Sequence, residues 1–133
     1  MKMHQEFPSA AALPVHTGKS ARTIAEVLAN GLCLVAEDEG RGIIGSIAGY
    51  VSKGLWYSDA LYLGDTWFFV APEDRSSGAA DQLVSAFLAE GARLKVPVQL
   101  AHISGSDLDR KDKFFERKKM IKMGSVFFLA APE

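Results

Sequence analysis

The sequence predicts one mixed α/β domain, in which a mostly antiparallel central sheet is flanked by helices. Runs rich in β-branched and aromatic residues alternate with amphipathic segments of helical period. A turn-forming segment joins two adjacent runs into a hairpin, and a central strand-turn-helix-strand order requires a parallel crossover. The length of 133 residues suits a single domain, 1–133, with a sizeable core.

Composition limits the function classes without selecting one. Fifteen basic residues nearly balance sixteen acidic ones, so the molecule as a whole has no charge that would attract nucleic acid or an anionic membrane. Cys33 is the only cysteine, which excludes an internal disulfide and a cysteine-rich metal site. No apolar run is long enough to span a bilayer, and we expect a cytoplasmic protein with no metal and no membrane partner.

The first 30 residues predict an arm and then a helix. Residues 1–18 are mixed in character and are interrupted by prolines, which indicates an arm or a short irregular element. Ser20–Asn30 predicts an amphipathic helix, because its apolar residues recur at helical spacing. Those residues are Ile24, Val27 and Leu28.

A hairpin is predicted next. Leu32–Glu37 and Ile43–Val51 are β-rich runs, and the polar, glycine-containing segment 38–42 connects them. Gly45 and Gly49 within the second run have two readings: a second backbone or a ligand approaches there, or they are small residues under a packed helix.

The centre of the chain predicts a long strand, a tight turn and a helix. Ala60–Val70 ends in the hydrophobic run 66–70, and Pro72 then stops the hydrogen-bond ladder. The segment 73–78 is polar and turn-forming. The following helix has one apolar face, formed by Ala80, Leu83, Val84, Phe87 and Leu88.

The C-terminal third predicts a strand, a helix and a strand. Val98–Ile103 is a β-rich run, and Ser106 or Asp107 can cap a helix that continues to about Met120. Ser125–Ala130 has strand composition and is expected to close the sheet.

The turn between the long strand and its helix predicts an anion site. The first amides of a helix have no intrahelical acceptor, and the helix dipole adds partial positive charge there. Gly78, Ala79 and Ala80 are small, so a diphosphate can approach the main chain closely. Arg75 adds a positive charge to the same turn.

The residues of this turn carry a resemblance to a known family. The order Arg75-Ser76-Ser77-Gly78-Ala79-Ala80 fits the pattern Arg/Gln-x-x-Gly-x-Gly/Ala of the GNAT superfamily of N-acetyltransferases, preceded as usual by Val-x-Pro-Glu. The order of elements from about Leu32 to Ala130 is similar to the GNAT order. The chain most resembles small phage or bacterial GNAT proteins of unassigned substrate.

This resemblance implies a fold, a cosubstrate and a reaction. The expected fold is the GNAT acyl-CoA N-acyltransferase fold, and the expected cofactor is acetyl-CoA, whose pyrophosphate is held by residues 75–80. The main chain of Phe68, Phe69 and Val70 is expected to pair with the pantetheine arm. The reaction is direct transfer of an acetyl group to a primary amine of a small molecule or protein, without a covalent enzyme intermediate.

The general acid of the family is missing from its usual place. The motif that resembles Tyr-x-x-x-Gly-Phe reads Phe115, Lys119 and Met120 here, and phenylalanine donates no proton. Three tyrosines remain as candidate acids, and Tyr57 is the first choice. They are Tyr50, Tyr57 and Tyr62.

Two carboxylates and three aromatic residues are candidates for the acceptor side. Asp65 at the start of the long strand is the first choice of general base, with Glu37 as the alternative; either is otherwise a solvated carboxylate. Trp56, Tyr57 and Trp67 are candidates for an aromatic acceptor pocket, with core packing as the alternative. The short N-terminal region leaves the acceptor cleft either open or completed by a second subunit of a homodimer.

Two other functions stay open. A GNAT-like module that binds the coenzyme with little turnover agrees with the loss of the tyrosine at position 115. The basic segment 110–122 is either a solvated helix face, a local anion patch or, less in keeping with the overall charge, a surface for nucleic acid or a protein partner.

Overall fold

The computed structural model describes residues 2–7 and 9–132; residues 1, 8 and 133 lie outside the described residues, two of them in the expected arm. The described chain divides into two compact units, Ala21–Leu100 and the combination of Met1–Ser20 with Ala101–Glu133. The single domain 1–133 stays a prediction. The elements, in chain order, are α1 (Lys2–Gln5), α2 (Thr17–Asn30), β1 (Leu32–Asp38), β2 (Gly42–Ser52), β3 (Tyr62–Val70), the 3-10 turn η1 (Pro72–Asp74), α3 (Ala79–Leu94), β4 (Val98–Gln99) and α4 (Leu108–Arg117).

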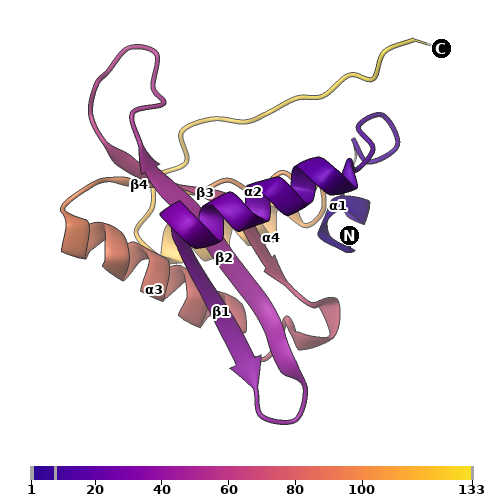
Figure 1. Ribbon diagram of the computed structural model, residues 1–133, viewed down its shortest axis with the longest axis horizontal. Helices are drawn as coiled ribbons and strands as arrows, with labels where there is room; N and C mark the ends of the chain where they lie inside the picture. The colour runs from indigo at the N-terminus through magenta and orange to yellow at the C-terminus, as the bar shows by residue number, and fades with distance from the viewer. Residues whose placement is uncertain (1, 8, 133) are drawn as a thin grey trace. The chain divides into compact units, whose positions relative to one another are not determined.

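The sheet of the unit Ala21–Leu100 has the strand order β1-β2-β3-β4 (Figure 1). β1 pairs with β2 and β2 with β3 in the antiparallel sense, while β3 and β4 are parallel. The hairpin, the long strand and the parallel crossover through α3 are therefore confirmed. The mixed α/β class, with a mostly antiparallel sheet, is confirmed as well.

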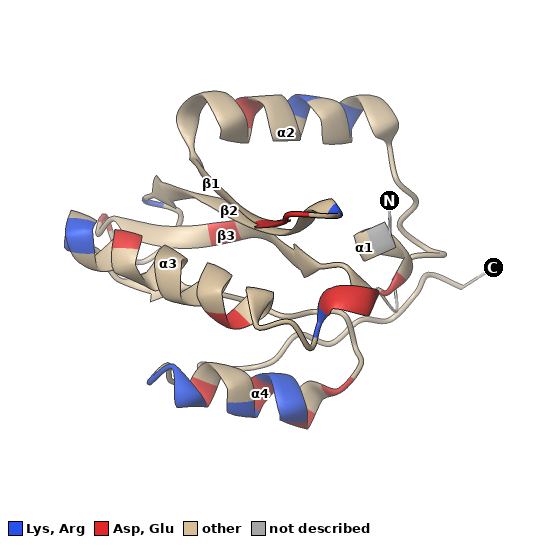
Figure 2. Ribbon diagram, turned by 90° about the horizontal axis from the view of Figure 1, so that it is seen from below, with Lys and Arg blue, Asp and Glu red and all other residues tan. Residues whose placement is uncertain are grey.

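Helices α2 and α3 cover opposite faces of this sheet (Figure 2). The apolar face of α3 packs on the strands as predicted, with Leu83, Val84 and Phe87 buried. Two members of the predicted face, Ala80 and Leu88, are only half-buried, because the helix turns its first residue and Gly91 toward the strands instead. The hydrophobic core consists of Val27, Ile47, Ala48, Leu63, Val70, Ala79, Leu83, Val84 and Phe87.

Helix α2 begins three residues earlier than predicted and buries less of its apolar face than its pattern indicates. Val27 is fully buried, whereas Ile24 is 42% exposed and Leu28 is 64% exposed. The helix therefore contacts the sheet through a narrow stripe around Val27.

The glycines of β2 mark close approaches of the neighbouring strand. A Cβ on Gly49 would lie 1.8 Å from the carbonyl oxygen of Gly64 in β3, which no side chain tolerates. A Cβ on Gly45 would lie 3.0 Å from the carbonyl oxygen of Phe69 and 3.3 Å from a methyl carbon of Leu83 in α3. A second backbone approaches at both positions, and a packed helix also approaches at Gly45.

The unit formed by the two ends of the chain holds α1, α4 and an extended tail. The described chain has no strand at Ser125–Ala130, so that prediction is wrong: Val126 is 82% exposed and Phe127 94% exposed. The predicted strand Val98–Ile103 is also too long, because only Val98 and Gln99 pair with β3. Strand composition alone does not form a ladder; a strand needs a partner.

A residue with left-handed backbone geometry flanks helix α4 at each end, Asp107 before it and Lys119 after it. Asp107 is the N-cap residue but makes no side-chain cap bond. At the other end the amides of Lys119 and Met120 bond to the carbonyls of Glu116 and Phe115, and Lys119 has a φ of 66°. Lys119 thus holds the left-handed backbone that favours glycine, at the position where the GNAT motif has glycine. No described helix combines the length and hydropathy that crossing a membrane requires.

Candidate functional site

The turn between β3 and α3 is built by short-range hydrogen bonds. Pro72 opens the 3-10 turn, and the amide of Asp74 donates to the carbonyl of Ala71 at 2.8 Å. The amide of Ser77 donates to the carbonyl of Asp74 at 3.0 Å, and the hydroxyl of Ser77 donates to the same carbonyl at 2.6 Å. The first helical amide, on Ala79, then donates to the Ser77 hydroxyl oxygen at 3.3 Å.

The turn leaves a row of main-chain donors at the start of α3. Among the described residues, no hydrogen bond engages the amides of Ser76, Gly78 and Ala80. Gly78 is the N-cap residue, has a φ of 85°, and would have no atom within 4 Å of an added Cβ. The space over the turn is therefore open, and the N-terminal end of the α3 dipole faces it.

The side chain of Arg75 folds back along the end of β3. Its Nε donates to the carbonyl of Val70 at 3.0 Å, and its guanidinium lies 5.3 Å from the centroid of the Phe69 ring. Two segments are expected to bind the coenzyme. Phe68 to Val70 lie at the end of β3, and Arg75 to Ala80 lie in the turn and at the start of α3.

Strand β3 pairs with β4 only near its beginning. Their parallel pairing covers only Leu63 with Val98 and Gly64 with Gln99, although β3 continues to Val70. On its other side β3 carries a bulge at Thr66, because Ala48 pairs with Trp67 while Gly49 pairs with Asp65. A bulge bends and twists its strand, so β3 changes direction close to where its pairing with β4 ends.

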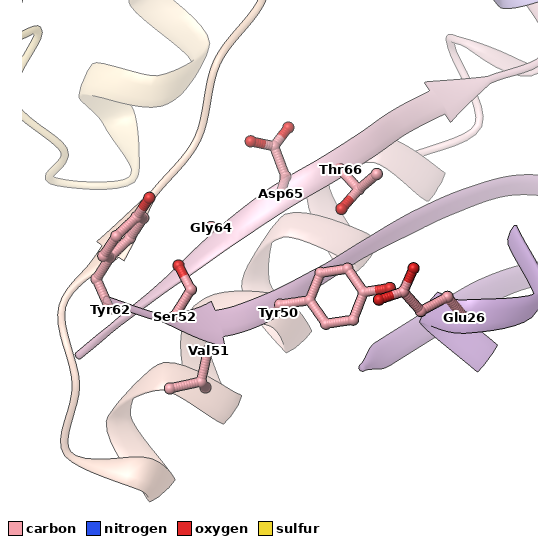
Figure 3. Close-up of a pocket in the computed structure, with 8 residues that line it drawn as sticks. All are labelled: Glu26, Tyr50, Val51, Ser52, Tyr62, Gly64, Asp65 and Thr66. Atoms are coloured by element: carbon pink, nitrogen blue, oxygen red, sulfur yellow. The ribbon is translucent and has the colours of Figure 1, made fainter. Parts of the chain in front are cut away.

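A pocket of about 390 Å³ lies beside this bulge. The residues that line it come from α2, β2 and β3 within the unit Ala21–Leu100 (Figure 3). Two carry carboxylates, four carry hydroxyl groups, and none carries a positive charge. They are Glu26, Tyr50, Val51, Ser52, Tyr62, Gly64, Asp65 and Thr66.

Tyr50 and Glu26 form the polar end of the pocket. Figure 3 shows the Tyr50 ring pointing from β2 toward the Glu26 carboxylate on α2. The Tyr50 hydroxyl is buried and has no hydrogen-bond partner among the described residues. Burial of the phenol, together with the negative charge of Glu26, raises the pKa of Tyr50 above the usual value of a tyrosine. The phenol is therefore neutral at physiological pH and has a proton to donate.

The structure places one of the predicted acceptor-side residues at the pocket. Asp65 lines it, whereas Glu37 is exposed on β1, where it pairs with Ile43. Trp56 and Tyr57 stack edge to face with each other in the loop before β3 and are 94% and 63% exposed.

Trp67 has a structural role in the sheet. Its indole nitrogen donates to the hydroxyl oxygen of Ser46 at 3.0 Å, and the Ser46 hydroxyl in turn donates to the carbonyl of Leu34 at 2.9 Å. This cross-strand chain corresponds to the packing alternative for Trp67. Phe115 stacks on the ring of His102, with centroids 5.7 Å apart, and so fills its position with an apolar contact.

Sequence reasoning missed Glu26 and Thr66. Glu26 precedes the single buried residue of α2, so its direction depends on which face of the helix meets the sheet. Thr66 is brought to the pocket by a bulge that no local pattern announces. Tyr50 and Tyr62, two of the three candidate acids, both line the pocket.

Comparison with solved structures identifies the fold. The chain is similar to AAC(6')-Iy in complex with the bisubstrate analogue CoA-S-monomethyl-acetylneamine, with a TM-score of 0.68 and 16% identity over 97% of this chain and 90% of that chain. It is also similar to the aminoglycoside 6'-N-acetyltransferase AAC(6')-Ih from Acinetobacter baumannii, with a TM-score of 0.66 and 15% identity over 93% and 86% of the two chains. An acetyltransferase from Trypanosoma brucei gives a TM-score of 0.63 and 15% identity over 98% and 92%.

The likeness is one of fold rather than of sequence. No family model matches the chain, and no curated protein matches it in sequence. The fold expected from the sequence is nevertheless confirmed by these structures over most of the chain.

Proposed function

We propose that this chain, which has the fold of the GNAT acetyltransferases, is an acetyl-CoA-dependent N-acetyltransferase. The observation that carries the proposal is the row of main-chain amides at Ser76, Gly78 and Ala80, open above the N-terminus of α3. A diphosphate supplies the acceptors that such a row lacks, and the helix dipole favours its negative charge. The similar structure of AAC(6')-Iy holds a CoA-containing analogue, which supports the same cosubstrate here.

The pocket beside β3 supports a small, cationic amine as the acceptor. Glu26 and Asp65 attract a protonated amine, and the surrounding hydroxyl groups suit a polar, hydroxyl-bearing molecule. Two of the similar structures are aminoglycoside 6'-N-acetyltransferases, which supports an amine on a small molecule over one on a protein.

The transfer needs one proton acceptor and one proton donor. In the proposed mechanism Asp65, directly or through water, removes a proton from the acceptor ammonium, and the free amine attacks the thioester carbonyl carbon. The new C–N bond forms as the C–S bond breaks, and the thiolate of coenzyme A leaves with the electron pair. The nitrogen then loses its second proton, which balances the proton that the departing thiolate takes up. Tyr50, whose buried hydroxyl lines the pocket without a hydrogen-bond partner among the described residues, is the donor proposed to replace the tyrosine missing at position 115. A thiol pKa near 8.5 also makes unprotonated departure feasible.

A melting scan with and without acetyl-CoA tests the cosubstrate. We expect a higher melting temperature with acetyl-CoA or CoA, because a ligand that binds only the folded state stabilises it in proportion to RT ln(1 + [L]/Kd). Adenosine at the same concentration, which lacks the diphosphate and pantetheine, is the control. A melting temperature that is unchanged at millimolar acetyl-CoA contradicts the proposal.

Thiol release with a panel of amines tests turnover and the acceptor class. We expect amino sugars and polyamines to release coenzyme A faster than neutral or acidic amines do. Asp65→Asn should lower kcat about 100-fold if Asp65 is the base, whereas Glu37→Gln should leave it unchanged. Binding of acetyl-CoA without thiol release from any amine would instead support the alternative of a coenzyme-binding module.

A further inference from the structure

The geometry points to Arg41 as a positioning residue for the diphosphate site. Arg41 lies in the hairpin turn between β1 and β2, and its ion pair with Asp74 fixes the turn between β3 and α3, which carries the binding amides. The inference rests on the proposed coenzyme function and adds to it a residue 34 positions before the turn motif Arg75–Ala80. Figure 1 shows the β1–β2 hairpin turn and the end of β3 at the same end of the sheet.

Arg41 grips the carboxylate of Asp74 with both terminal nitrogens. Its Nη2 donates to Oδ2 at 2.7 Å, and its Nη1 donates to Oδ1 in a second, shorter contact. The Asp74 side chain is only 6% exposed, whereas that of Arg41 is 47% exposed. Asp74 is the one charged residue that is buried among the described residues. A buried carboxylate without its cation is strongly unfavourable, so Asp74 depends on Arg41 to stay where it is.

Asp74 is also the anchor of the turn. Its carbonyl accepts both the amide and the hydroxyl of Ser77, and the Ser77 hydroxyl oxygen accepts the first helical amide, that of Ala79. A displaced Asp74 would therefore release Ser77 and, with it, the direction of the neighbouring amides at Ser76 and Gly78. Arg41 thus acts on bound phosphate through the turn.

Arg41 also offsets the negative charge that precedes the turn. Glu73 and Asp74 place two negative charges directly before an anion-binding turn, which opposes the binding of a diphosphate. Arg41 compensates both, because its Nη2 also lies 3.4 Å from the Glu73 carboxylate. Removing Arg41 therefore both loosens the turn and takes away the positive charge that lies beside these two carboxylates.

Three acetyl donors distinguish a positioning role of Arg41 from direct contact between Arg41 and a phosphate and from a general loss of folding. Acetyl-CoA carries the diphosphate and the 3′-phosphate, acetyl-3′-dephospho-CoA carries only the diphosphate, and acetylpantetheine carries neither. The variants are Arg41→Ala, Arg41→Lys and the control Arg93→Ala, which removes an arginine whose exposed ion pair with Glu90 lies on α3 away from the turn. The measurements are KM and kcat for each donor at a fixed acceptor concentration, with the Kd of CoA for the wild-type chain measured first.

We expect Arg41→Ala to raise KM for both phosphate-containing donors by about 10-fold to 100-fold, with kcat changed less than KM. Arg41→Lys should restore part of the loss, because it keeps the charge without the two-pronged geometry. Acetylpantetheine should be used equally well by Arg41→Ala and the wild-type chain. Arg93→Ala should resemble the wild-type chain with all three donors.

Each other outcome has its own meaning. A rise in KM confined to acetyl-CoA would make Arg41 a direct ligand of the 3′-phosphate and overturn the inference. An equal rise in KM with all three donors, or no change with any of them, would overturn it as well. If the wild-type chain binds no CoA, the proposed function itself fails, and this inference fails with it. That result is distinguishable, because it appears before any variant is made.

Discussion

Gly78→Asp tests whether the open amides of the turn hold a diphosphate. Gly78 is left-handed, with a φ of 85°, and an added Cβ would meet no atom within 4 Å. The substitution therefore brings no clash, and its cost to folding is that of a left-handed backbone at a residue with a side chain, about 1 kcal/mol. The new carboxylate stands at the N-terminus of α3, where the phosphates are proposed to bind.

The expected loss of affinity follows from Coulomb's law. A carboxylate about 6 Å from a phosphate charge, at an effective dielectric constant of about 40 to 80, is repelled by about 0.7 to 1.4 kcal/mol. The two charges of a diphosphate double this figure, so Kd should rise about 10-fold to 100-fold. Gly78→Asn is the matched control, because asparagine has nearly the same size and also tolerates the left-handed conformation but carries no charge.

Isothermal titration with CoA measures both variants, and thermal melting without ligand checks that they fold equally. We expect Gly78→Asp to bind at least 10-fold more weakly than Gly78→Asn at low ionic strength, with the difference shrinking as salt is added. Equal affinities for the two variants would show that no phosphate lies near Gly78. The placement of the coenzyme on this turn would then be wrong.

Three further changes test the rest of the fold. Gly49→Ala should lower the free energy of unfolding in urea by about 3 kcal/mol or more, because its Cβ would lie 1.8 Å from the Gly64 carbonyl oxygen; a loss below 1 kcal/mol would contradict that contact. Lys119→Gly should raise the same quantity by about 0.5 to 1 kcal/mol, since it relieves a left-handed lysine with a φ of 66°. Hydrogen bonds from Lys122, and to a lesser extent from His102, hold the pKa of the Asp112 carboxyl below its usual value. The contribution of Asp112 to folding stability is therefore present above the usual pKa and is lost as the pH falls through the lowered pKa. Asp112→Asn should therefore speed amide exchange in α4 at pH 7 and have no effect at a pH below the folded pKa.

The parts of the fold that the sequence predicted are those that neighbouring residues encode. The hairpin depends on two β-rich runs and a polar turn, which lie within 21 residues from Leu32 to Ser52. The long strand, Pro72 and Gly78 are likewise consecutive signals, and each excludes the alternatives at its own position. The open amides of the turn could likewise be predicted, because the first amides of a helix have no intrahelical acceptor.

The parts that the sequence did not predict depend on residues far apart in the chain. Ser125–Ala130 has the composition of a strand but is not one in the described chain, because composition does not decide pairing. The pocket unites a helix, a strand and a bulge, so the contribution of Glu26 appears only when α2 lies on the sheet. The Arg41–Asp74 pair spans 33 positions, and the turn sequence alone describes Asp74 as an ordinary turn residue.

This difference bears on how the two halves of the proposed activity are best tested. In the proposed function, coenzyme binding depends on main-chain amides. Side-chain substitutions weaken these contacts only indirectly, by changing charge or backbone conformation as at Gly78 and Arg41. Acceptor binding is proposed to depend on the carboxylates of Glu26 and Asp65, which isosteric amides remove directly. Neutral variants at these two positions should therefore change acceptor KM or kcat while the Kd of CoA stays constant. Coenzyme affinity that followed acceptor-side charge would mean that the two ligands share one site, and the pocket beside β3 would lose its separate role.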